Sequence, residues 1–157
     1  MSTPQHQIIA QLGESSAYSA KNHFKAADVR KRTTIILIII NIIVSVITLT
    51  TLISSNTIIQ ILSAGSLGAS IYLLTLESRD GQNNPERHMG FGNKYLSLHN
   101  ELFALYQQPN PSQQELDELK KKLNKLNESE RPYINGIARR MCKSAIEERG
   151  EMNIWWK

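Results

Sequence analysis

The longest uncharged segment of this chain most constrains its fold. Residues 33–76 contain no Asp, Glu, Lys, Arg or His, although the 157-residue chain carries 18 Lys and Arg and 14 Asp and Glu. The polar turn sequence SSN, residues 54–56, divides this segment into residues 33–54 and 57–76. As helices, these pieces would be about 33 and 30 Å long, close to the thickness of the hydrocarbon core of a bilayer. The sequence therefore predicts an all-α membrane protein with a two-helix transmembrane hairpin.

Two soluble folds compete with the transmembrane hairpin. Ile, Val and Thr favour strands, so the segment also fits a buried sheet. It fits a core hairpin too, but burying 44 uncharged residues on every side would need far more protein than the other 113 residues supply. Both alternatives are therefore less favoured. We expect no cleaved signal peptide, because the first span is longer than the 7–15-residue apolar core of such peptides.

Basic residues flank the hydrophobic segment on both sides and predict its orientation. Arg30, Lys31 and Arg32 stand directly before it, where we expect them at the membrane surface, and Arg79 follows it. The turn between the spans carries no charge, so the positive-inside rule places both termini in the cytoplasm. The pI is near 9.3, and the basic residues that raise it lie next to the spans, where they would attract anionic lipid. Direct nucleic-acid binding is therefore possible but not favoured. The predicted location is the inner (plasma) membrane, as a multi-pass protein.

Polar residues within the predicted spans form a stripe along each helix. At 100° per residue, the stripe consists of Asn41, Ser45, Thr48, Gln60, Ser63 and Ser70. Because polar groups that face lipid are unfavourable, the stripe either joins the helices by hydrogen bonds or lines a pore. Both interpretations stay open. A pore would require several copies of the chain, because two helices enclose no lumen.

Small residues occupy the opposite side of the second span. They are Ala64, Gly65, Gly68 and Ala69. Small residues four positions apart let helix backbones approach closely within a membrane. We therefore expect this face to pack against another helix and to contribute to a homo-oligomer.

The sequence outside the spans predicts further helices. Residues 1–32 form a cytoplasmic N-terminal segment whose basic lead-in helix continues into the first span. Residues 77–108 place apolar side chains at three- and four-residue spacing, which indicates an amphipathic cytoplasmic helix. Residues 109–157 form a C-terminal helical extension. Its first helix begins with a capping box at Ser112 and Glu115, and its last covers about residues 132–149.

No catalytic or metal-binding pattern is present in the sequence. His6, His23, His88 and His99 are scattered, and none stands at ligand spacing from Cys, Asp or Glu. The single Cys142 excludes an intrachain disulfide and is expected to be a buried thiol on the apolar side of a helix. We therefore expect no enzyme activity, no metal and no cofactor.

Basic and aromatic residues of the C-terminal extension are candidate contacts for a partner. They are Lys121, Lys125, Arg139, Arg140, Trp155 and Trp156. Trp and Arg often dominate protein contacts. The lysine run also fits a solvated face with the i,i+4 pairs Asp117–Lys121 and Glu118–Lys122. The two tryptophans also fit an anchor at the membrane interface.

The layout resembles the SLATT family, two-transmembrane effectors associated with SMODS nucleotidyltransferases and SLOG sensor domains in bacterial conflict systems. The resemblance rests on KNHFKAADVRKRTT running into the first span, the short turn, and ERHMGFGNKYLSLHNEL after the second span. It covers about residues 15–108. The positions that look recurrent in the family are Lys21, His23, Phe24, His88 and Tyr95. The compact form is similar to members that accompany reverse transcriptases.

This resemblance implies a membrane-embedded effector of a bacterial anti-phage defence system. Such a protein would oligomerise and permeabilise or depolarise the inner membrane. We expect control by a separate cytoplasmic partner, either a nucleotidyltransferase, a SLOG protein or a reverse transcriptase. The alternatives are a phage holin-like pore-forming lysis protein and a non-pore membrane scaffold. The long helical region after Leu76 argues against the holin, because holins usually end in a short basic tail.

Overall fold

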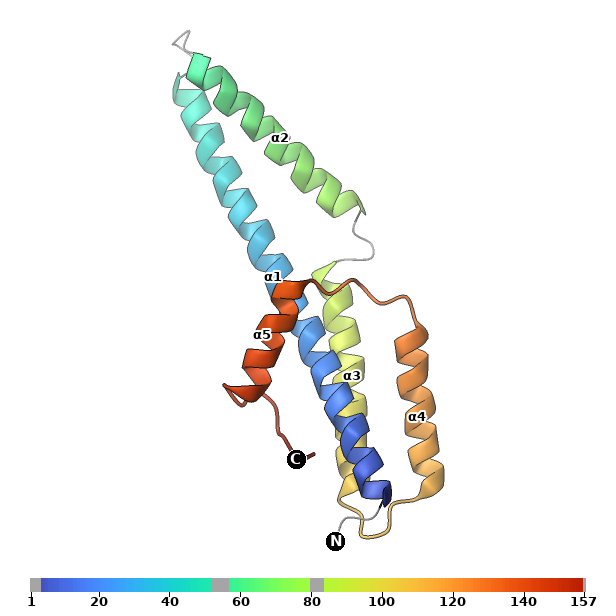
Figure 1. The fold of residues 1–157 in the computed structure, drawn as a ribbon. Coiled ribbons are helices and arrows are strands. Elements are labelled where there is room, and N and C mark those ends of the chain that lie inside the picture. Colours follow the sequence, from blue (N-terminus) through green and yellow to red (C-terminus); the bar gives the residue numbers. More distant parts are fainter. Residues whose placement is uncertain (1–3, 52–56, 80–83, 157) are drawn as a thin grey trace.

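The computed structural model describes residues 4–51, 57–79 and 84–156, and within them every regular element is an α-helix (Figure 1). The helices are α1 (Pro4–Thr51), α2 (Thr57–Arg79), α3 (Pro85–Tyr106), α4 (Gln113–Glu128) and α5 (Gly136–Glu147). The predicted all-α class is confirmed.

Helix α1 is a single helix of 48 residues that joins the predicted lead-in helix to the predicted first span. Pro4 occupies its first position, where a missing N–H costs nothing. Between Gly13 and the end of the helix the sequence contains neither Gly nor Pro, so nothing local interrupts it. The lower half of α1 belongs to a helical bundle, and its upper half forms a hairpin with α2 (Figure 1).

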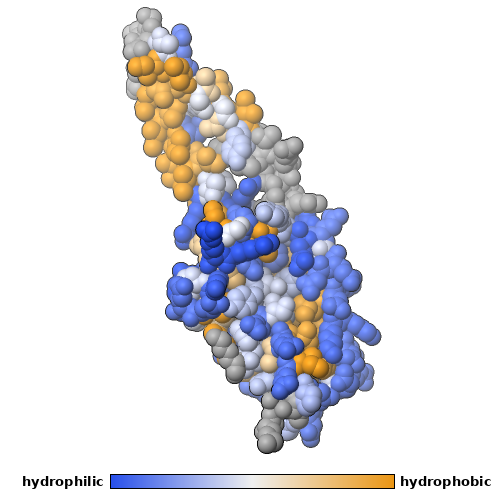
Figure 2. Space-filling view, in the orientation of Figure 1, coloured by the Kyte–Doolittle hydropathy of each residue, from blue (hydrophilic) through white to orange (hydrophobic). Residues whose placement is uncertain are grey.

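The described part of the hairpin carries exposed apolar side chains. Ile36, Ile42 and Ile61 are 56, 57 and 67 % exposed. Figure 2 shows apolar surface over the hairpin and mostly polar surface over the bundle. As far as their described residues go, none of the helices is both long and apolar enough to cross a membrane. The predicted turn at residues 54–56 lies outside the described residues.

The core of the bundle lies where α3 packs between α1 and α4, while α5 lies against another side of α1 (Figure 1). Its buried residues are Ile9, Ala20, Phe91, Tyr95, Leu98, Leu102, Leu105, Leu116, Leu119 and Leu123. Burying a leucine of this kind stabilises the fold by roughly 2 kcal/mol. Gly92 marks the close approach of α3 to α1, because a Cβ at this position would collide with the Phe24 ring.

Side chains at the helix ends explain where α4 and α5 begin. The Ser112 hydroxyl accepts a hydrogen bond from the Glu115 backbone N–H at 3.4 Å, which is one half of the predicted capping box. Helix α5 begins at Gly136, so the predicted start near residue 132 was wrong. Pro132 disfavours helical backbone in the residue before it. The Asn135 side chain then caps the helix by accepting from the Ala138 N–H at 2.8 Å.

Candidate functional site

A polar cluster joins α1 to α2 within the hairpin. The Asn41 amide donates to the Ser70 hydroxyl at 2.8 Å, and the Ser66 hydroxyl donates to the Asn41 carbonyl oxygen at 2.8 Å. The Ser45 and Ser66 hydroxyls lie 3.2 Å apart. The structure therefore brings Asn41, Ser45 and Ser70 of the predicted stripe together. Sequence reasoning missed Ser66, although it lies one helical turn before Ser70.

The other stripe residues lie outside this cluster. Gln60 is exposed, and its amide forms no hydrogen bond with another described residue. Ser63 is half-buried, and the side chain of Thr48 lies outside the described residues. Within the cluster, the hydrogen bonds of Asn41 thus serve the contact between the two helices.

The predicted helix-packing residues face away from other helices of the chain. A Cβ added at Gly65 or Gly68 would meet nothing within 4 Å. Ala64 is exposed and Ala69 is half-buried. This small-residue face is therefore open in the single chain, and its predicted packing role stays a prediction.

Two histidines meet at the centre of the bundle. The Nδ1 atoms of His23 on α1 and His88 on α3 lie 3.1 Å apart in a buried hydrogen bond. The His23 ring stacks on Phe91 and Tyr95, with ring centroids 5.4 and 5.8 Å away. Burial, followed by the charges of His88 and Arg131, lowers the pKa of His23 to about 4. Burial and the charge of Arg30 lower the pKa of His88 as well.

The histidines were predicted to be scattered, and for His23 and His88 this was wrong, because the fold brings the two side chains together. Each of the two stands on the buried side of an amphipathic helix, a signal that could have paired them. Among the described residues, no group of three or more His, Cys, Asp or Glu is arranged to hold a metal. Cys142 is buried as predicted, and burial raises the pKa of its thiol to about 11.

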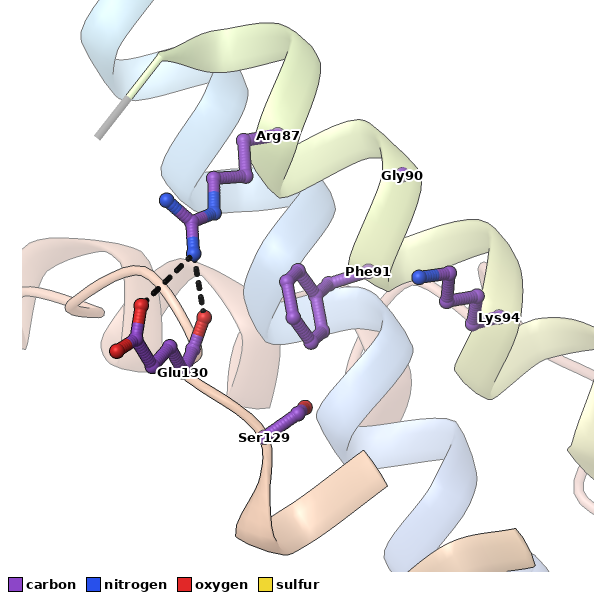
Figure 3. Close-up of a pocket in the computed structure, with 6 residues that line it drawn as sticks. All are labelled: Arg87, Gly90, Phe91, Lys94, Ser129 and Glu130. Carbon is purple, nitrogen blue, oxygen red and sulfur yellow. Dashed lines mark hydrogen bonds and ion pairs between the residues drawn. The ribbon is translucent and has the colours of Figure 1, made fainter. Parts of the chain in front are cut away.

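A hollow of about 390 Å³ opens between α3 and the connection from α4 to α5 (Figure 3). Its lining consists of Arg87, Gly90, Phe91, Lys94, Ser129 and Glu130. Arg87 donates to the Glu130 carbonyl at 2.8 Å and lies 3.8 Å from its carboxylate. The Lys94 ammonium lies 5.2 Å from the centre of the Phe91 ring, a cation–π distance. The positive charge of Arg87 is thus largely balanced by Glu130 within this hollow.

A second hollow of about 360 Å³ lies beside the first, and Ser129 lines both. We call it the basic hollow. Its polar lining consists of His23, Asn127, Ser129, Arg131 and Arg139, and its apolar lining of Pro132 and Ile134. Arg131 donates to the Tyr95 hydroxyl at 3.3 Å and to the Asn127 side-chain oxygen at 3.2 Å. Among the described residues, the lining contains two guanidinium groups and no carboxylate.

A family model described as SMODS and SLOG-associating 2TM effector domain 6 matches residues 2–142 of the chain. The chain belongs to the SLATT family. The match extends beyond the predicted resemblance at residues 15–108 and includes α4 and the beginning of α5. No curated protein and no solved structure was found to match the chain.

The positions that carried the resemblance lie together in this SLATT chain. His23 contacts His88 and Tyr95 across the interface between α1 and α3. Phe24, the next residue on α1, packs against Gly92 of α3. Lys21 stands three residues before Phe24 on α1 and forms an ion pair with Glu151 at 2.7 Å. The five positions that carried the resemblance therefore all form contacts within the folded chain.

The C-terminal residues of the SLATT chain fold back along α1 and α3, and we call residues 150–156 the C-terminal clasp. Gly150 adopts a φ of 61°, and the Glu151 N–H donates to the Ala145 carbonyl at 2.9 Å. The Glu151 carboxylate accepts from Lys21 and Lys25, and these hydrogen bonds lower its pKa to about 2.

Both tryptophans of the clasp contact the SLATT bundle itself. The Trp155 ring packs on Phe103 and Tyr106, with centroids 5.4 and 5.1 Å away, and lies directly over Gly13. The edge of Trp156 meets the His99 ring at 5.3 Å. A partner that used these two residues would therefore have to replace contacts within the chain.

The predicted basic residues of the SLATT chain lie on its surface. Lys121 and Lys125 on α4 and Arg139 and Arg140 on α5 are exposed. The predicted pairs Asp117–Lys121 and Glu118–Lys122 are not found among the described residues. Instead, Lys120 pairs with Asp117 at 3.6 Å, and Lys122 pairs with Glu101 of α3 at 2.6 Å. Lys122 thus pairs with an acid of the neighbouring helix α3 instead of with Glu118 of its own helix.

The three predicted membrane-surface residues lie on α1, between the part that packs in the bundle and the part that pairs with α2. Arg30 is half-buried, and Lys31 and Arg32 are exposed. Their place at the boundary in Figure 1 agrees with their position in the sequence, directly before the uncharged segment.

Proposed function

We propose that this chain is the membrane-embedded effector of a bacterial anti-phage defence system. It oligomerises through its hairpin and permeabilises or depolarises the inner membrane, under the control of a separate cytoplasmic partner. The family to which the chain belongs is described as a 2TM effector domain, which supports this proposal. The observation that carries the proposal is the contrast between the apolar hairpin and the polar bundle (Figure 2).

Membrane insertion is supported by the chemistry of the hairpin. Residues 33–76 contain no Asp, Glu, Lys, Arg or His, and Ile36, Ile42 and Ile61 are more than half exposed. Exposing apolar area to water costs about 25 cal/mol for each Å², and large contiguous patches of this kind mark contact surfaces. Lipid would remove that cost. Arg30, Lys31 and Arg32 would then lie at the cytoplasmic face, with both termini in the cytoplasm.

Assembly is supported by the face that the hairpin leaves open. The polar cluster around Asn41 occupies the contact between α1 and α2. A Cβ at Gly65 or Gly68 would meet no atom within 4 Å, and Gly65 and Ala69 have the four-residue spacing that permits close helix contacts in lipid. A second copy of the chain fits this face. Several hairpins are then required to perturb the bilayer, because one pair of helices encloses no lumen.

Control by a partner is supported by the different chemistry of the hairpin and the bundle. Residues 33–76 of the hairpin contain no Asp, Glu, Lys, Arg or His that could respond to a cytoplasmic signal, whereas the bundle carries the basic hollow and the C-terminal clasp. The partner classes that fit the family are a nucleotidyltransferase, a SLOG protein and a reverse transcriptase.

A non-pore membrane scaffold is the second candidate, and one observation favours it. Asn41, Ser45, Ser66 and Ser70 hydrogen-bond to one another, so these polar groups hold the hairpin together without lining water. Gln60, which is exposed, is then the stripe residue best placed to face a lumen.

Leakage from proteoliposomes tests the proposal. The full chain, reconstituted at increasing protein-to-lipid ratio, is expected to release an entrapped dye with a steep dependence on that ratio. Gly65→Leu should block release, although the single chain has room for the new side chain. Thr57→Leu adds apolar bulk elsewhere on α2 and should leak like the wild type. Inserted wild-type protein that releases no dye at any ratio would favour the scaffold.

A further inference from the structure

The basic hollow has a charge that its own surroundings do not balance. Arg131 spends its two hydrogen bonds on the neutral side chains of Tyr95 and Asn127. Arg139 is exposed and forms no ion pair with the described part of the chain. Glu130 is the nearest acid in the connection, but it pairs with Arg87 in the neighbouring hollow (Figure 3). Two guanidinium groups therefore share one cavity to which no described residue contributes a carboxylate.

The remaining lining offers hydrogen-bonding groups beside these two charges. Asn127 contributes an amide, whereas the Ser129 hydroxyl already donates to the Leu126 carbonyl at 2.7 Å. The His23 ring reaches the hollow although the residue is only 1 % exposed. Its Nδ1 is engaged with His88, and its Nε2 has no hydrogen-bond partner among the described residues. A ring nitrogen that lines a hollow can donate to or accept from a bound molecule, depending on the tautomer of the ring.

The position of the hollow also matters. The connection from α4 to α5 crosses the end of the bundle that faces the hairpin (Figure 1). The volume of about 360 Å³ is within the range of small-molecule sites. Guanidinium groups bind phosphate oxygens in a bidentate geometry, and two of them near one cavity favour a dianion over a neutral ligand.

We propose that the basic hollow is a binding site for a phosphate group, held by Arg131 and Arg139. The phosphate can come from a soluble phosphate ester or from the headgroup of a lipid, because the connection that lines the hollow crosses the end of the bundle that faces the hairpin (Figure 1). A phosphate held by Arg131 and Arg139 would join this connection to α5. The inference goes beyond the proposed function and does not require the chain to permeabilise a membrane.

Neighbouring arginines provide a matched pair of variants. Arg139 lines the hollow, whereas Arg140 does not, and both are exposed on α5. R139Q and R140Q remove the same charge from adjacent positions, so they separate a specific contact from a general loss of positive charge. Neither side chain is buried in the core, so both variants are expected to fold.

Calorimetric titration of inorganic pyrophosphate into the full chain, held in nanodiscs of phosphatidylcholine, tests the soluble source. Saturable binding by the wild type is expected, with R139Q at least tenfold weaker and R140Q within about twofold of the wild type. For the lipid source, the wild type and R140Q should unfold at a higher temperature in phosphatidylglycerol nanodiscs than in phosphatidylcholine, and R139Q should not.

Either pattern supports the site and identifies the source of the phosphate. The inference is overturned if the wild type shows neither effect, or if R139Q and R140Q change both measurements equally. The leakage assay does not depend on this result, since Gly65→Leu acts on the hairpin and R139Q acts on the bundle.

Discussion

The indole N–H of Trp155 donates to Nε2 of His99 at 3.0 Å, and this bond defines the protonation state of the imidazole. An indole nitrogen can only donate, so Nε2 must be unprotonated. On the other side of the ring, Nδ1 lies 2.9 Å from the Gly13 carbonyl oxygen, which can only accept. His99 is therefore neutral, with its proton on Nδ1, and it links the C-terminal clasp to the backbone of α1.

Acidification should release the clasp. Burial lowers the pKa of His99 below its ordinary value of 6.5, although the hydrogen bond to Gly13 opposes this shift. The bond to Trp155 is therefore kept at neutral pH and lost as the pH falls through the lowered folded-state pKa, when Nε2 gains a proton. Tryptophan emission should shift to longer wavelength as that proton binds.

The matched variant for this prediction is His99→Gln. An amide oxygen can accept the indole N–H, and it does not titrate in this range. The emission of the variant should therefore stay nearly constant between pH 7 and pH 5. An equal shift in the wild type and the variant would contradict a role for His99.

The His23–His88 pair should make the bundle sensitive to acid. The folded-state pKa of His23 is about 4, below its ordinary value of 6.5, so the unfolded chain binds a proton more readily. Stability is then complete above about pH 6.5 and falls as the pH approaches 4, by roughly 3 kcal/mol for a shift of this size. Denaturant unfolding of the chain in detergent, followed by circular dichroism at several pH values, measures this slope.

His23→Phe should flatten the pH dependence, because a phenyl ring keeps the stacking on Phe91 and Tyr95 but does not titrate. His6→Gln is the control, since His6 bonds to the Gln108 carbonyl away from this pair. If His23→Phe keeps the slope of the wild type, the acid sensitivity comes from other groups.

Asn41→Leu should loosen the hairpin. The change removes the partner of both Ser66 and Ser70, at a cost of about 1 kcal/mol for each hydrogen bond lost. Spin labels at Ile38 and Leu67, both exposed, would report the separation of α1 and α2 by pulsed electron resonance. A broader distance distribution is expected for Asn41→Leu than for Ile42→Leu, which keeps every hydrogen bond of the cluster. Identical distributions would show that the cluster does not hold the helices.

The predicted topology can be tested with cysteine labelling in intact cells. In a Cys142→Ser background, a cysteine at Ser55 should react with a membrane-impermeant maleimide, and a cysteine at the exposed Asn124 of α4 should not. Cys142 itself is a poor reporter, because it is buried and its thiol pKa is raised to about 11. Labelling at Asn124 but not at Ser55 would reverse the orientation.

Several features of this chain were determined by the sequence alone, because they depend on neighbours within one or two helical turns. The absence of charge from residue 33 to residue 76, the apolar spacing of α3, and the cap at Ser112 each act locally. In the structure, α1 to α4 cover these stretches of the sequence. The buried state of Cys142 followed from its helix face in the same way.

Contacts between distant helices were decided only by the tertiary structure. The helical period tells which face of α1 or α3 is buried, but the rotation and register of the two helices depend on how all their side chains pack at once. The meeting of His23 with His88 and of Trp155 with His99 depends on that register. Ser66 joins Asn41 for the same reason, since the polar partner stands on the other helix.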